Sequence, residues 1–539
     1  MKYRQKAVFF VFVMTTLLLL PLSACGEDSG IGSNGGKNTK SSVFVTVPGV
    51  AGQAQTAAQA TIISARLTMG RVTFRYNPTI SAGNVISQNP VEGASVTSGT
   101  AVNLVVSRGA DNAKTSLTTY YVSPAGSDEN NGLSENTPLQ DLAKAIYRMD
   151  MGDTLIVLPG NYELVDFTAW CKDPSKKRMY LGPGGGSAEI RTTIKGKAGG
   201  ERPRIVARTS KGTIGRLVFN NANGLTLEYL DIHGGIAYGN NMIYRDLVIG
   251  GKGTTYAISG LHNNALIENN YIHDIYGSND GIGIYISGNN NIIRGNFFKN
   301  MSQHAINSHS ASKWIIEQNY ITDTEGHGIG MRGVKDFTIR NNVLVNVGSQ
   351  AISFAGKLSN IKVIGNTIYN YEKKGFYGLF FIDEITGVFI ANNILVHHKP
   401  VAFQRPDIQL TPEKVKTYTF RNNIYYNPTS KDGRLFITDE SQGKFLTLKE
   451  WQEFTAKVIG DGIGLDQGSK SMDPLVVSPP YSAKDYLEYD SQSHINMQLT
   501  GKSPAIGSGM DVDLSHDMLG NARPQNKKYD IGAYEFIGE

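Results

Sequence analysis

Three of the chain's ten histidines gather in one short stretch, and an arginine follows them. The histidines are His304, His309 and His327, and the arginine is Arg332. An imidazole accepts or donates a proton near neutral pH, whereas a guanidinium is a permanent cation. A neutral imidazole beside such a cation is suited to removing a proton that lies next to a carboxylate. This stretch is therefore the first candidate for chemistry in the chain.

The elements that must position these residues follow from a repeat. One Asn recurs among short apolar segments at intervals of 26, 23, 23, 24, 27 and 30 residues. A period near 23 with β-branched strands predicts a parallel β-solenoid. Asn suits its turns because it tolerates left-handed backbone geometry, and stacked Asn side chains can form a hydrogen-bonded ladder. The predicted ladder consists of Asn270, Asn296, Asn319, Asn342, Asn366, Asn393 and Asn423.

Aligning the coils on this ladder predicts which side chains share an outer wall. The alignment stacks five residues in one column, about 4.8 Å apart from coil to coil: Asp280, His304, His327, Gln350 and Lys374. Side chains alternate between the two faces of a strand, so a second set is predicted to point outward: Tyr285, Asn307, His309, Arg332 and Ser353. Gly283 and Gly330 are expected to clear space beside them for a chain-like ligand.

This wall divides into two predicted sets. The predicted catalytic residues are Tyr285, His304, His309 and Arg332. The residues predicted to contact the ligand are Asp280, Asn307, His327, Ser353 and Lys374. Stacking His304 on His327 and His309 on Arg332 should lower the histidine pKa values by mutual repulsion and keep a neutral base near pH 7.

Such a base beside a cation favours β-elimination on a uronate polysaccharide. Arg332 would offset the sugar carboxylate, His309 or His304 would take the C5 proton, and Tyr285 would protonate the leaving oxygen. A non-catalytic glycan-binding or matrix-organising role remains open, and so does a uronate C5-epimerase. A glycoside hydrolase would need paired carboxylates, for which Asp280, Asp323, Glu325, Asp383 and Glu384 are candidates. A metal site made by the three histidines is left unassigned, because no pattern nearby secures ligand geometry.

The opening of the main body carries a family resemblance. The segment "YYVSPAGSDENNGLSENTPLQDLAKAI" is expected to place a helix from Pro138, with Thr137 as its N-cap. With "GDTLIVLPGNY" it resembles the start of secreted right-handed parallel β-helix enzymes, including polysaccharide lyases of families six and nine. The resemblance implies that the helix covers the open end of the coil.

The catalytic sets of those families are not visible here. Where family nine clusters Asp residues for calcium, this chain offers Asp280 alone, and the Lys and Arg-His-Gly signature of family six is missing. A requirement for a cofactor is therefore unknown. Calcium stays open, with "DENNG", Asp128 to Gly132, as a small candidate loop beside the alternative of an Asx-rich turn.

The N-terminus predicts export and anchoring. Residues 1–24 combine a basic start with an apolar run, as in a signal peptide. The following "LSAC" resembles the lipobox of bacterial lipoproteins, which implies lipidation of Cys25. Residues 25–42 are rich in Gly, Ser, Asn and Lys and are expected to form a flexible tether. The predicted location is the bacterial cell envelope, on the outer membrane or the cell surface.

Residues 43–109 resemble a PASTA domain in "VPGVAG", "QNPVEG" and "VNLVVSRG". The resemblance implies a small α+β spacer or binding module, in some proteins for peptidoglycan. Loss of residues 1–24 removes Lys2, Arg4 and Lys6 and no acid, so a net charge of +5 becomes +2. A nearly neutral mature chain predicts no nucleic-acid partner.

The predicted architecture is an all-β, right-handed parallel β-helix over residues 119–427, with an N-terminal capping helix. Residues 428–539 are expected to pack on it as a C-terminal cap region. Within this region "LTLKEWQEF" predicts a helix with a Thr447/Glu450 capping box. The predicted partners are an acidic polysaccharide, peptidoglycan through the PASTA-like domain, and the membrane through the lipid on Cys25.

Overall fold

A computed structural model describes most of the chain after residue 42, in two compact units, Met1–Asp111 and Asn112–Glu539. The described residues are 43–75, 77, 79–107, 117–150, 152–170, 191–220, 222–277, 280–370, 378–381, 385–397, 401–402, 412–428, 433–439, 444–477, 497–525 and 527–538. The predicted signal peptide and tether, together with Cys25, Lys374, Asp383 and Glu384, lie outside them.

The first unit is a small α+β domain, as expected. Its elements are β1 (Phe44–Thr46), α1 (Gln55–Ser64), β2 (Thr68–Arg75), β3 (Val85–Asn89), β4 (Ser95–Thr97) and β5 (Ala101–Ser107). Strand β5 lies between β2, to which it is parallel, and β3, to which it is antiparallel, while β1 and β4 form a separate pair. The helix buries Ala58 and Ile62 against Val85 and Leu104, which makes a core of the unit's own.

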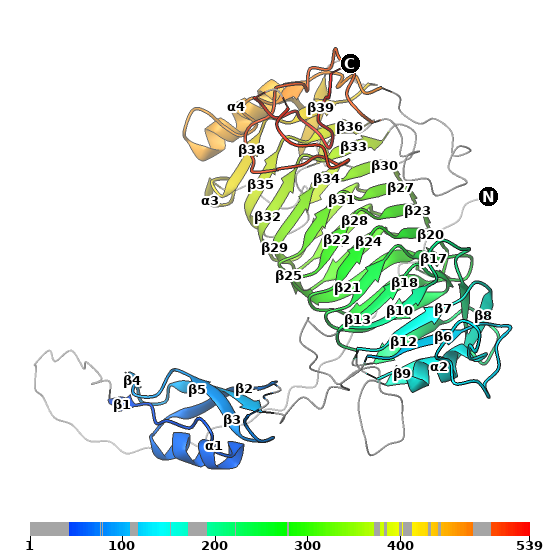
Figure 1. Ribbon diagram of the computed structural model, residues 1–539. Helices are drawn as coiled ribbons and strands as arrows, with labels where there is room; N and C mark the ends of the chain where they lie inside the picture. The colour runs from blue at the N-terminus through cyan, green and yellow to red at the C-terminus, as the bar shows by residue number, and fades with distance from the viewer. Residues whose placement is uncertain are drawn as a thin grey trace, which may run out of the picture. The chain divides into compact units, whose positions relative to one another are not determined.

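The second unit is a parallel solenoid whose stacked coils are evident in Figure 1. One wall, called here the site wall, is formed by β9 (Thr168–Trp170), β12 (Arg216–Asn220), β15 (Gly235–Ala237), β18 (Tyr256–Leu261), β21 (Ile282–Asn289), β24 (Ile306–His309), β28 (Ile329–Arg332), β31 (Ile352–Ala355) and β34 (Leu379–Phe381). Every pairing in it is parallel, so corresponding residues of successive coils stand side by side.

Two further walls close each coil. The second wall contains β6 (Thr119–Val122), β7 (Thr154–Val157), β10 (Thr192–Gly196), β13 (Leu225–Glu228), β16 (Ile243–Arg245), β19 (Leu266–Glu268), β22 (Ile292–Arg294), β25 (Ala311–Ser312), β26 (Ile315–Glu317), β29 (Lys335–Arg340), β32 (Leu358–Ile364), β35 (Ile385–Ala391) and β38 (Tyr418–Arg421). The third wall contains β8 (Asn161–Val165), β11 (Arg204–Arg208), β14 (Asp231–His233), β17 (Val248–Gly250), β20 (Tyr271–Ile275), β23 (Phe297–Met301), β27 (Tyr320–Thr324), β30 (Val343–Val347), β33 (Thr367–Asn370), β36 (Ile394–His397), β39 (Ile424–Tyr426) and β42 (Lys470–Ser471).

The predicted Asn ladder joins the second and third walls. All seven Asn side chains are buried, and each bonds to the next: Asn319 Nδ2, for example, donates to Asn342 Oδ1 at 3.0 Å. The left-handed backbone belongs instead to the residue before each ladder Asn, such as Asn269 and Gln318, so the ladder residue itself is free to turn inward. The ladder fixes the stacking of the coils.

The capping helix α2 (Leu142–Arg148) starts later than the sequence predicts. Asp141 is its N-cap and accepts a hydrogen bond from the Lys144 backbone N–H at 3.1 Å. The predicted start at Pro138 is wrong because Leu139 is extended and pairs with Val122 of β6. The helix still buries Leu142, Ala145 and Ile146 in the solenoid core, at the end of the coil opposite α4 (Figure 1).

The chain closes the other end of the solenoid with a mixed region. It contains β37 (Val401–Ala402), α3 (Pro412–Val415), β40 (Arg434–Asp439), β41 (Lys444–Thr447) and α4 (Leu448–Ile459). The Thr447/Glu450 capping box of α4 is present as predicted. The C-terminal segment lies against the Asn turns, where Asn341 and Asn392 donate to the carbonyl oxygens of His516 and Met510.

Candidate functional site

The site wall sets the register of the candidate residues. Tyr285 on β21 pairs with Asn307 on β24, and Asn307 pairs with Gly330 on β28. Two residues further along, His309 pairs with Arg332. Both His309 and Arg332 are exposed, and Tyr285 and Asn307 are half-buried, so these four side chains share the outer surface that alternation predicts.

Two of the aligned positions differ from the prediction. Ile306 pairs with Ile284 and not with Ile282, so Asp280 lies two residues away from the level of His304. Ile352 pairs with Leu379, which is not the partner that the alignment assumed. Lys374 lies outside the described residues, so its place in the column stays a prediction. The reason is that coils change length in the loops before β21 and β34, while alignment assumed a nearly constant period.

Two further expectations for the wall concern Ser353 and the glycines. Ser353 pairs with Gly330 in the outward column, but it is only 4% exposed, because alternation fixes the side of the sheet that a residue takes and not whether that side is covered. Gly283 does not open the groove, since a Cβ there would lie 3.0 Å from the buried Phe298 ring and so faces the core. Gly330 does face outward, where a Cβ would lie 3.4 Å from His327 and 3.5 Å from Asn307.

His304 and His327 form a stacked pair at the edge of the wall. Their ring centroids are 4.5 Å apart at an interplanar angle of 8°. The backbone N–H of His327 donates to Nδ1 of His304 at 2.8 Å, so this nitrogen carries no proton. The pKa of each imidazole is lowered to about 4, chiefly by burial, and for His304 the neighbouring His327 contributes to this shift. The predicted direction is right, but burial outweighs repulsion as its cause.

His309 is the more accessible imidazole. Its ring meets Tyr285 edge to face, with centroids 5.6 Å apart at 86°. Partial burial lowers the pKa of His309, and Arg332 on the neighbouring strand lowers it further. Tyr285 also packs against Tyr256 of β18, with centroids 5.4 Å apart. The Tyr256 hydroxyl in turn donates to Oδ2 of Asp280 at 3.1 Å, which places Asp280 beside this aromatic pair.

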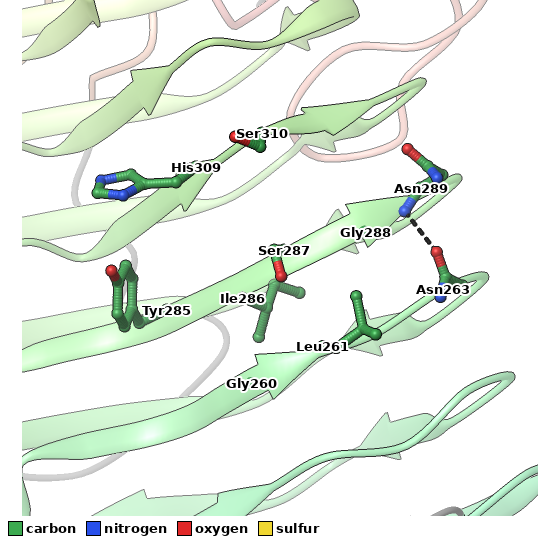
Figure 2. Close-up of a pocket in the computed structure, with 10 residues that line it drawn as sticks. All are labelled: Gly260, Leu261, Asn263, Tyr285, Ile286, Ser287, Gly288, Asn289, His309 and Ser310. Carbon is green, nitrogen blue, oxygen red and sulfur yellow. Dashed lines mark hydrogen bonds between the residues drawn. The ribbon is translucent and has the colours of Figure 1, made fainter. Parts of the chain in front are cut away.

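A hollow of about 630 Å³ opens beside Tyr285 and His309 on this wall. Figure 2 shows the two side chains projecting from neighbouring strands toward the same side. The residues that line the hollow are Gly260, Leu261, Asn263, Tyr285, Ile286, Ser287, Gly288, Asn289, His309 and Ser310. The sequence prediction missed Leu261, Asn263 and Asn289. A signal for the two Asn residues existed, because they are 26 residues apart like the ladder positions, and the Asn289 N–H donates to Asn263 Oδ1 at 2.9 Å.

The side chains considered for hydrolysis or for binding a metal ion do not come together in one place. Asp323 belongs to β27 on the third wall, so it does not face Asp280 across a site-wall groove. Within the described ranges, no group of three or more His, Cys, Asp or Glu side chains is arranged to hold a metal ion. In the same part of the chain, no helix has the length and apolar character needed to cross a membrane.

Comparison with protein families identifies both units. Residues 217–395 match the model described as a right handed beta helix region, and residues 45–108 match the PASTA domain model. A probable serine/threonine-protein kinase from Clostridium acetobutylicum is 33% identical over 104 residues, which cover 19% of this chain and 16% of the kinase. The chain thus matches only a small part of that protein's length.

Several solved structures share similarity with the chain. A rhamnogalacturonan lyase has 14% identity and a TM-score of 0.40, covering 67% of this chain and 91% of its own. A pectate lyase has 12% identity and a TM-score of 0.41, covering 78% and 97%. A family PL6 alginate lyase has 14% identity and a TM-score of 0.39, covering 62% and 52%. From the family models and the parallel walls together, the chain carries an N-terminal PASTA domain followed by a right-handed parallel β-helix.

Proposed function

We propose that the β-helix is a polysaccharide lyase that cleaves uronate-containing chains by β-elimination. One observation carries the proposal: an exposed His309 pairs in register with Arg332, which forms no ion pair with any described residue, and meets Tyr285 edge to face beside an open hollow. A base, a cation and a hydroxyl donor are the three groups that this reaction needs around one sugar.

His309 is the proposed base, in place of the earlier alternative His304. The imidazole of His304 is largely covered by its stack on His327, and its Nδ1 already accepts a backbone hydrogen bond. His309 is exposed, and its lowered pKa keeps the ring neutral at pH 7. A neutral, accessible imidazole is the form that can accept a proton.

The proposed step balances without a cofactor. Arg332 pairs with the uronate carboxylate and stabilises the negative charge that develops when His309 takes the C5 proton. The electron pair of the C5–H bond forms a C4–C5 double bond, and the C4–O bond breaks. Tyr285 gives its hydroxyl proton to the departing oxygen. Afterwards Tyr285 regains a proton from solvent, and His309 releases the C5 proton to solvent. The products are an unsaturated uronate and a new chain end.

The test is incubation of the purified chain with a panel of uronate polymers, followed by absorbance of the unsaturated product. We expect product from wild type and from Lys335→Gln, an exposed lysine on the second wall, and a loss of at least about a hundredfold in His309→Ala and Arg332→Ala. Binding without product would contradict the lyase and favour the glycan-binding alternative. New reducing ends without unsaturation would indicate hydrolysis, and inversion at C5 without cleavage would indicate an epimerase.

The remaining segments fit an enzyme held in the bacterial envelope. We propose that Cys25 is lipidated, that residues 25–42 tether the folded units, and that the PASTA domain contacts peptidoglycan. Incorporation of labelled palmitate into the wild-type chain and not into Cys25→Ser is the expected result. Labelling of both would contradict the anchor at this residue.

A further inference from the structure

A second hollow lies further along the site wall, toward the N-terminal coils. It measures about 460 Å³ and is lined by Asp166, Phe167, Arg208, Thr209, Ile214 and Arg216, with Gly215, Val218, Thr255 and Tyr256. Tyr256 lines the second hollow, and its ring packs against Tyr285, which lines the first. The two hollows are therefore joined by an aromatic pair on neighbouring strands.

Arg216 is the distinctive side chain of the second hollow. It is exposed, its Nη1 donates to Oγ of Ser259 at 3.2 Å, and within the described part of the chain it forms no ion pair. Arg208 in the same hollow is engaged, since its Nε donates to Glu163 at 3.1 Å. The carboxylate of Asp166 is likewise engaged, because it accepts the backbone N–H of Ser210 at 3.0 Å. Arg216 is thus the cation of this hollow that is available to a ligand.

The register fixes how far apart the two available arginines stand. From β12, which carries Arg216, to β28, which carries Arg332, there are five steps between paired strands of one wall. At about 4.8 Å per step the separation across the strands is about 24 Å. Only an extended chain can reach both guanidinium groups at once.

The surface between the arginines is not suited to carboxylates. Its centre is the Tyr256 and Tyr285 pair, where the carboxylate of Asp280 accepts a hydrogen bond from the Tyr256 hydroxyl. Aromatic rings favour the apolar faces of sugars, and Asp280 repels a second carboxylate brought close to it. The groups that can bind uronate carboxylates are therefore Arg216 and Arg332, at the two ends of this surface.

We propose that Arg216 forms a second carboxylate subsite of the same groove, and that the ligand is a glycan whose uronates are separated by neutral sugars. This inference rests on the proposed function for the identity of the ligand as a uronate chain. It adds that the glycan runs across the strands, and that Arg216 binds a carboxylate of the glycan far from the reacting sugar at His309. A polymer of contiguous uronates would bring a carboxylate against Asp280.

Binding measurements on the purified full chain test the proposal. The probes are reducing-end-labelled oligosaccharides of unsulfated chondroitin, in which uronate and neutral sugars alternate, and oligogalacturonates of equal lengths, in which uronates are contiguous. Fluorescence anisotropy gives a Kd for each length. We expect chondroitin affinity to rise by about tenfold once the chain spans both arginines, and oligogalacturonates to show a smaller rise.

Three variants locate the effect. Arg216→Gln should abolish the gain for long chains and leave short ones unchanged, Arg216→Lys should keep part of it, and Lys335→Gln should keep all of it. A gain that survives in Arg216→Gln, an equal gain for oligogalacturonates, or no binding by either series overturns the inference. If unsaturated product forms but Arg216→Gln keeps the affinity gain for long chains, the subsite is overturned and the lyase proposal stands. If the predicted binding pattern is found but no product forms, the lyase proposal is overturned and the subsite stands.

Discussion

At the scale of single residues, the proposed chemistry depends on how Arg332 tunes His309. The two residues pair across neighbouring strands, and both partial burial and the arginine lower the histidine pKa. Since the base must be neutral, activity should rise with pH through the pKa of His309 and level off near neutrality.

The first prediction concerns this rising limb. Replacing Arg332 with Gln removes a cation that disfavours the imidazolium, so the pKa of His309 should increase and the limb should move to higher pH. A pH profile of kcat/KM for wild type and for Arg332→Gln, measured at high enzyme concentration, checks this. A limb that stays in place would show that the titrating group is not His309.

The second prediction separates the two roles of Tyr285. Tyr285→Phe keeps the ring that packs on Tyr256 and His309 but loses the proton donor, so kcat should fall by about a hundredfold with little change in KM. Tyr285→Ala should raise KM as well, because the ring is lost. Equal kinetics for Tyr285→Phe and wild type would remove this residue from the mechanism.

At the scale of elements, the sequence predicts the repeat better than the details of each coil. The Asn ladder could be predicted because a buried amide must satisfy its donors and acceptors, and stacking identical residues does so in every coil. The register of β24 and β28 also followed, since their interval equals the usual 23 residues. Coils with longer or shorter loops could not be aligned in this way, and Asp280 was misplaced for that reason.

The third prediction tests the ladder. Asn319 accepts hydrogen bonds from the backbone and side chain of Asn296 and donates to Ile293 O and Asn342 Oδ1. Asn319→Ala leaves these buried groups unpaired, so the free energy of unfolding should fall by about 3–5 kcal/mol. Urea denaturation measures it, with Asn161→Ala, at an exposed position of β8, as a control. A loss no larger than that of the control would contradict the ladder's role.

The fourth prediction concerns the stacked histidines. His304 and His327 have a pKa of about 4 in the fold, against an ordinary 6.5, so the unfolded chain binds more protons between these values. Their contribution to stability is complete above about pH 6.5 and is lost as the pH falls toward 4, by up to about 3 kcal/mol per imidazole before solvent screening.

Comparison with a double variant isolates this effect from other titrating groups. His262 is also buried, with a pKa of about 4, and it remains in the variant His304→Gln/His327→Gln. The difference in unfolding free energy between wild type and this variant should shrink steadily from pH 7 to pH 4.5. A difference that is independent of pH would mean that the pair is not held neutral by burial.

At the scale of the whole molecule, composition and pattern predicted the two units and the β-helix, because periodicity and turn chemistry are written in local sequence. Alternation also predicted that Asn307, His309 and Arg332 face outward. The hollow beside them could not be predicted, since it depends on Leu261, Asn263 and Asn289 of two preceding turns. Nor could the second hollow at Arg216, which lies 93 residues before His309 in the chain but on the same wall.

A crystal structure of the His309→Ala chain with a bound uronate oligosaccharide tests the central claim most directly. The ligand should cross β21, β24 and β28, with a uronate carboxylate on Arg332, its C5 facing the vacated position of residue 309, and the Tyr285 hydroxyl beside the glycosidic oxygen. Ligand density on the second or third wall, with the surface around Arg332 empty, would contradict the account.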